Sequence, residues 1–141
     1  MIGVAAACAM AGAAPHASRA QAEEFRLVTP PLSQFRDQVR PAAATLPLPS
    51  GFSREQIVHG DRVFHGEAAN GQCSVCHALD GKGTANGNDL TAGMFVWSDG
   101  SVGQLKRTIL HNMAVAPGRD GDLTPADVEA VSAYVWAISH Q

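Results

Sequence analysis

The chain has 141 residues, of which 45% are hydrophobic and 16% charged, a length and composition that suit one folded domain and little more. They exclude a collagen-like chain and a membrane protein with many spans. The formal net charge of −3 argues against the broad basic surface of a nucleic-acid-binding protein. Aromatic residues make up only 6%, which is low for this size unless something other than side chains fills part of the core.

The first 22 residues have the pattern of an export signal. Residues 2–14 are uncharged, rich in small apolar side chains, and too few to cross roughly 30 Å of hydrocarbon as a helix. Residues 20–22 (Ala-Gln-Ala) form a small-x-small cleavage site, and residues 18–20 are a second candidate. We expect residues 1–22, including Cys8, to be removed on export to the periplasm. The alternatives are a buried N-terminal helix, an uncleaved, membrane-retained segment, and a lipid anchor on Cys8.

Residues 23–52 contain five prolines and show no sustained periodicity. Proline removes amide donors and pushes the residue before it towards extended geometry. We therefore expect a proline-rich extended arm ahead of a folded domain at residues 53–141, with at most one helical turn around residues 33–39. The arm is either an unstructured linker or a segment that wraps the domain or docks on a partner.

A first helix is predicted to begin after Ser53. Ser53 and Gln56 have the spacing of a capping box, which satisfies the unpaired amides at a helix start. Gly60 and Phe64 then share one face of the helix. Because glycine inside a helix costs about 1 kcal/mol relative to alanine, Gly60 needs a packing reason, such as the close approach of another helix. The helix should end near residues 65–66.

Residues 66–100 are rich in glycine and are predicted to form loops with short helical turns. A further helix is predicted over residues 101–113, with Ser101 and Gln104 again spaced as a capping box. His111 falls on its polar side. Its apolar face carries Val102, Leu105, Ile109 and Met113.

The last helix has the clearest start signal. Thr124 suits the N-cap, Pro125 the first helical position and Asp127 the third, near the positive end of the helix dipole. Its apolar stripe consists of Val128, Val131, Tyr134, Val135 and Ile138. No segment has convincing strand alternation, so the predicted fold is all-α.

Residues 73–77 read Cys-Ser-Val-Cys-His, the C-x-x-C-H sequence of covalent haem attachment. The spacing lets Cys73 and Cys76 add to the two vinyl groups of one porphyrin, which holds His77 under the iron as an axial ligand. A zinc site would need a second ligand pair, which is missing, and a thioredoxin-like pair would need a strand–helix setting. A plain disulfide would leave His77 without a role.

Over residues 53–139 the chain resembles class I c-type cytochromes. The resemblance rests on Gly60 and Phe64, the haem motif at residues 73–77, the region 111–118 and the Tyr134-Val135 pair. It implies a cytochrome c fold of three to four helices around one covalent haem c. It also implies one-electron transfer to a redox partner protein or membrane oxidoreductase complex, with no catalysis on a small-molecule substrate. Residues 80–97 are further similar to the haem domains of the diheme subunit of cbb3-type oxidases.

The sixth iron ligand departs from the family pattern. The family places a methionine directly before a proline ahead of the last helix, but here that dipeptide is Ala116-Pro117. Met113 is the favoured ligand, with Met94, His111 or no protein ligand as the alternatives; His59 and His65 lie on the first helix. An open or weakly held sixth position would instead indicate a haem-based binder or sensor of gases.

Two further expectations concern the surroundings of the haem. The family usually orients the axial histidine through a proline carbonyl soon after the motif. No proline lies between Pro49 and Pro117, so another carbonyl must accept the hydrogen bond from His77. Trp97 either contacts the haem, by packing or by an indole hydrogen bond to a propionate, or packs in the core.

Overall fold

A computed structural model describes residues 38–115 and 123–141 of the chain. These residues form four helices and no strand; the helices are α1 (Arg54–Phe64), α2 (Ser74–His77), α3 (Val102–Val115) and α4 (Pro125–Ile138). None of the four is long and apolar enough to cross a membrane. The predicted all-α fold is confirmed. The expected signal segment, residues 23–37 of the arm and the dipeptide Ala116-Pro117 lie outside the described residues.

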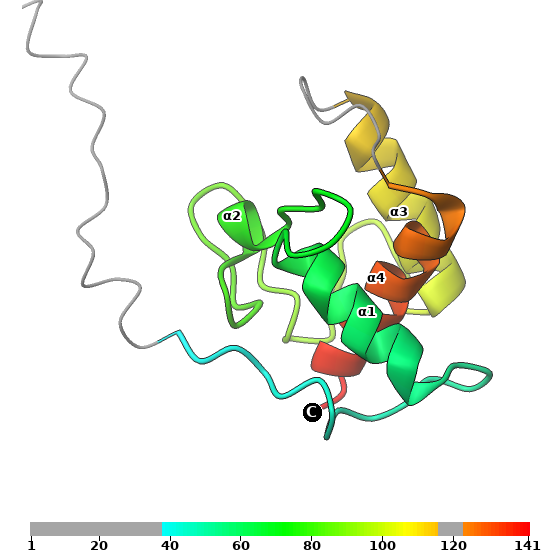
Figure 1. The fold of residues 1–141 in the computed structure, drawn as a ribbon. Helices are drawn as coiled ribbons and strands as arrows, with labels where there is room; N and C mark the ends of the chain where they lie inside the picture. The colour runs from blue at the N-terminus through cyan, green and yellow to red at the C-terminus, as the bar shows by residue number, and fades with distance from the viewer. Residues whose placement is uncertain (1–37, 116–122) are drawn as a thin grey trace, which may run out of the picture. The chain divides into compact units, whose positions relative to one another are not determined.

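Helices α1 and α4 cross each other, and α3 packs along α4 (Figure 1). The crossing is centred on Gly60, where an added Cβ atom would lie 2.1 Å from the carbonyl oxygen of Ala130 and 2.9 Å from the Cβ of Tyr134. Backbone therefore meets backbone where α1 lacks a side chain. This close approach confirms the packing reason expected for glycine at this position.

The helices begin where the sequence signals place them, but the capping box predicted at the start of α3 is only half formed. The Ser101 hydroxyl accepts a hydrogen bond from the Gln104 amide, whereas the Ser101 amide donates to the Asp99 carboxylate instead of the Gln104 side chain. Ser53 accepts a hydrogen bond from the Gln56 amide, and the Gln56 side chain accepts one from the Ser53 amide. Thr124 and Asp127 form the same reciprocal box at the start of α4. Because both boxes are complete, they satisfy amides that a helix start otherwise leaves unpaired.

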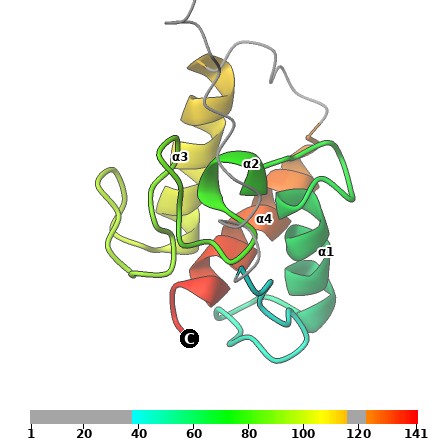
Figure 2. The same cartoon turned by 90° about the vertical axis from the view of Figure 1, so that its left-hand side faces the viewer.

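The core lies between α1, α4 and the first half of α3. Figure 2 views the same elements from the side and shows α2 and its flanking loops in front of this packed group. All five residues of the predicted α4 stripe are buried, together with Leu105 of α3. The buried α1 side chains in this core are Ile57, Val63 and Phe64.

Residues 38–52 pack against the helices. Ala43 and Leu46 are buried members of the core. Arg54, at the start of α1, donates hydrogen bonds from Nη1 to the carbonyl oxygens of Ala43 (2.8 Å) and Leu46 (2.6 Å). In this part of the arm the chain wraps the domain, which was one of the two alternatives that the sequence left open.

Candidate functional site

The haem-attachment motif lies on the one-turn helix α2 and is fixed by the loops on both sides. Before the motif, an added Cβ atom at Gly71 would lie 2.1 Å from the carbonyl oxygen of Val63, so this loop runs directly over α1. After it, the Thr84 hydroxyl donates a hydrogen bond to the carbonyl of Cys76 at 2.6 Å. A backbone contact therefore holds the start of the motif against the end of α1, and a side-chain hydrogen bond holds its second cysteine.

Both cysteines of the motif and His77 line a cavity of about 660 Å³. This volume lies within the range of about 300–1,000 Å³ that is typical of ligand and cofactor sites. Apolar side chains of the three long helices complete the wall: Phe64, Leu105, Ile109, Met113, Val131 and Val135. Two thiols and an imidazole on a wall of an otherwise largely apolar cavity are the donor set that a covalently attached porphyrin needs.

His77 is oriented by a backbone carbonyl. Its Nδ1 donates a hydrogen bond to the carbonyl oxygen of Asn88 at 2.8 Å. The bond fixes the tautomer with Nε2 deprotonated, which is the form in which imidazole binds a metal. The expectation that a carbonyl other than that of proline orients His77 is confirmed. The absence of proline after the motif predicted a substitute, but only the fold identifies Asn88.

The candidate sixth ligands differ in position. Met113, half-buried on α3, and Met94, exposed in the loop before α3, both line the cavity. His111 is exposed and is not among the described residues that line it. Trp97 also lines the cavity and is exposed at its rim. The structure thus brings both methionine candidates and the tryptophan to one cavity, and Met113 is the more enclosed of the two methionines.

The histidines on and beside α1 have protein partners instead. The His59 Nε2 lies 2.6 Å from Oδ1 of Asp127, a hydrogen bond that joins α1 to α4. His65 hydrogen-bonds through both ring nitrogens, and neither histidine is among the described cavity-lining residues. The hydrogen bonds of His65 reach the residues that follow the haem motif, which the sequence did not predict because they join segments 14 residues apart.

Charge at the cavity is negative. Asp89, which lines it, accepts hydrogen bonds of 2.7 Å from both the hydroxyl and the amide of Thr91. The hydroxyl bond in particular lowers the pKa of the Asp89 carboxyl, so this side chain is a carboxylate at neutral pH. The cation whose charge acts on Asp89 is Lys82, whereas Lys106 forms an ion pair with Glu129 at 3.3 Å. A negative charge close to the iron stabilises its oxidised form.

The sequence model of the family described as "Cytochrome c" matches residues 57–139, more than half of the chain. The match begins within α1, includes the whole haem motif and its cavity, and continues to the end of α4. It is a match to the family as a whole, so the similarity to oxidase haem domains stays a prediction. No solved structure matches the chain.

Proposed function

Because this chain belongs to the cytochrome c family and therefore binds one covalent haem c for electron transfer, we propose that it is an exported one-electron carrier of the periplasm. Its partners are a redox protein or a membrane oxidoreductase complex. Export is supported by the apolar segment and the small-x-small site in residues 1–22. The chain has only two lysines, Lys82 and Lys106, so a lysine-rich docking face is not expected.

The proposed iron site uses four side chains. Cys73 and Cys76 would hold the porphyrin through thioethers, and Nε2 of His77 and the sulfur of Met113 would be the protein ligands of its iron. The observation that best supports this site is that both thiols, His77 and Met113 line one cavity. The bound haem supplies a single electron that is gained or lost at the iron.

The remaining residues of the site set the environment of that electron. Aliphatic side chains from α3 and α4 line one side of the cavity and would shield a bound haem from water there, which would strengthen the electrostatic effect of each nearby charge. The Asn88 carbonyl keeps the His77 ring in one orientation. An iron held by two protein ligands needs little rearrangement when its charge changes. These features favour electron transfer over substrate chemistry.

Visible spectroscopy of the holoprotein tests this assignment. We expect the methionine–iron charge-transfer band in the oxidised wild type and its loss in Met113→Ala. Met94→Ala is the matched control, because Met94 lines the same cavity from a different segment, and it should keep the band. A band that survives Met113→Ala and disappears in Met94→Ala would transfer the ligand role to Met94.

Binding of carbon monoxide to the reduced protein distinguishes an electron carrier from a gas-binding protein. The reduced wild type should not bind CO rapidly at neutral pH, because Met113 occupies the sixth position, whereas reduced Met113→Ala should bind it. Rapid CO binding by the wild type would contradict the proposed carrier and support the gas-binding alternative. Neither outcome affects the covalent attachment, which a denaturing gel stained for haem reports independently.

A further inference from the structure

The turn that follows His77 is strained. Ala78 has φ +65° and ψ 165°, a combination that is essentially restricted to glycine, and its side chain is buried. A non-glycine residue persists in this region of the backbone only where its surroundings hold it there. Because Ala78 directly follows the proposed iron ligand, whatever holds this turn also affects the position of the His77 imidazole.

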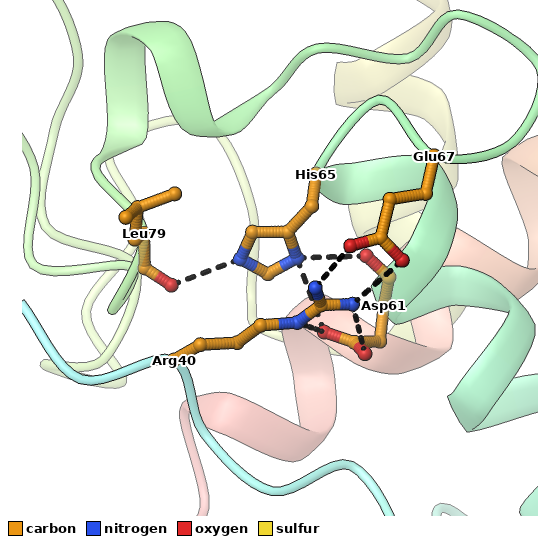
Figure 3. Close-up of polar contacts among 5 residues, drawn as sticks. All are labelled: Arg40, Asp61, His65, Glu67 and Leu79. Atoms are coloured by element: carbon orange, nitrogen blue, oxygen red, sulfur yellow. Dashed lines mark hydrogen bonds and ion pairs between the residues drawn. The ribbon is translucent and has the colours of Figure 1, made fainter.

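The residue after Ala78, Leu79, is held by hydrogen bonds to both its backbone amide and its backbone carbonyl. The Leu79 amide donates a hydrogen bond to Oε1 of Gln38 at 3.2 Å, and the Leu79 carbonyl accepts one from Nε2 of His65 at 3.0 Å. Figure 3 shows the His65 ring between this carbonyl and Asp61. The end of the strained turn is thereby attached to residue 38 and to the end of α1.

His65 faces only acceptors. Its Nδ1 lies 2.8 Å from the carbonyl oxygen of Asp61 and 3.1 Å from the carboxylate Oδ1 of the same residue, while Nε2 faces the Leu79 carbonyl. A neutral imidazole has one N–H and would present a lone pair to one of these oxygens. The imidazolium has two N–H groups and satisfies both sides. The side chain is 3% exposed, so water does not supply the missing donor.

The charges around His65 balance when it is protonated. Arg40 forms an ion pair with Asp61 at 2.6 Å and a second ion pair with Glu67 (Figure 3). Two cations then face two anions in this cluster. From α4 the ring of Tyr134 lies 6.2 Å from that of His65, and burial raises the pKa of its hydroxyl, so it stays neutral. Burial alone would lower the pKa of His65, but the hydrogen bonds to Asp61 and Leu79 outweigh it and raise that pKa.

We infer that His65 is a positioning residue for the proximal iron ligand: as a buried imidazolium it clamps the Leu79 carbonyl to Asp61 and so fixes the strained turn after His77. Arg40 and Asp61 hold the clamp in its charged form. The inference rests on the proposed ligation of the iron by His77. His65 lies outside the cavity, yet through it the pH of the solution affects the reduction potential of the haem.

Imidazole nitrogen NMR of the wild-type holoprotein tests the charge state without any substitution. Both ring nitrogens of His65 should carry protons at neutral pH. A single neutral tautomer at that pH would overturn the inference. The covalent haem and the methionine band would be unchanged by this result, so failure of the clamp is distinguishable from failure of the proposed function.

The reduction potential tests the positioning role. Loss of a cation near the iron disfavours the reduced form, so the midpoint potential of the wild type should fall as the pH rises through the pKa of His65. His65→Gln should lose this step. His59→Gln should keep it, because His59 lies on α1 and also hydrogen-bonds to an aspartate, but that aspartate is on α4 and not near the turn. Identical profiles for wild type and His65→Gln would overturn the inference.

Ala78→Gly tests the mechanical link. Glycine adopts the backbone conformation of Ala78 without strain. In Ala78→Gly the turn should therefore depend less on the hydrogen bond from His65. His65→Gln should shift the midpoint potential less in the Ala78→Gly background than in the wild type. Equal shifts in both backgrounds would show that His65 does not act through this turn. If His65→Gln yields no folded holoprotein, the nitrogen spectra still decide the question.

Discussion

At the scale of the single residue, the crossing of α1 and α4 depends on the side chain that Gly60 lacks. A Cβ atom there would lie 2.1 Å from the Ala130 oxygen and 2.9 Å from the Tyr134 Cβ, and neither neighbour is the flexible end of a side chain. We expect Gly60→Ala to lower the free energy of unfolding by about 1–3 kcal/mol, the usual cost of overpacking a core. Urea unfolding of the holoprotein measures this loss.

Gly103 is the matched control, because an added Cβ atom at this position in α3 meets nothing within 4 Å. Gly103→Ala should therefore cause no loss, and should gain up to about 1 kcal/mol from helix propensity. The same gain at Gly60 is outweighed by the clash. Equal stabilities of the two variants would show that the helices can separate at Gly60 at little cost.

At the scale of the element, residues 38–52 belong to the fold through a few buried side chains. Leu46 is 5% exposed and packs in the core, whereas Leu48, two residues later, is 43% exposed. We expect Leu46→Ala to lower the free energy of unfolding by about 2–5 kcal/mol, because it leaves a cavity next to α1. Leu48→Ala should change it far less. Unfolding curves with equal midpoints for the two variants would mean that this segment contributes nothing to stability.

The start of α4 depends on its capping box. The Asp127 carboxylate accepts hydrogen bonds from the Thr124 amide (2.8 Å) and hydroxyl (2.6 Å), and the Thr124 hydroxyl accepts one from the Asp127 amide. Thr124→Ala removes the hydroxyl and should cost about 1 kcal/mol of stability. Thr124→Ser keeps the hydroxyl and should recover most of that loss in the same thermal or urea unfolding assay.

The sequence predicted those parts of the fold that have local signals. The capping box of α1, the Thr124 N-cap, the stripe of α4 and the C-x-x-C-H motif each lie within one short segment, so residue type and spacing were sufficient. The packing of residues 38–52 and the contact between His65 and Leu79 join segments far apart in the chain. Nothing in the local composition of either partner encodes such contacts, because they exist only once α1 and the motif are folded together.

At the scale of the whole molecule, the Arg40–Asp61–His65 cluster should make the free energy of unfolding fall at both low and high pH. Hydrogen bonds from His65 and Arg40 overcome the effect of burial and lower the pKa of Asp61 below its usual 3.8. The contribution of Asp61 is therefore complete above pH 3.8 and is lost as the pH falls through its lowered, folded-state pKa. The pKa of His65 is raised above its usual 6.5. Its contribution is complete below pH 6.5 and is lost as the pH rises through the folded-state pKa.

Stability should thus be greatest between about pH 4 and 6.5, where both groups are charged in the folded protein. Urea unfolding of the holoprotein in its reduced form, over a series of pH values, measures both losses. His65→Gln should remove the decline on the alkaline side, because glutamine does not titrate, while His59→Gln should retain it. If the stability of His65→Gln falls by the same amount at high pH, other groups cause the alkaline loss. Because the cluster ties residue 40, α1 and the turn after His77 together, the alkaline loss should accompany the fall in midpoint potential over the same pH range.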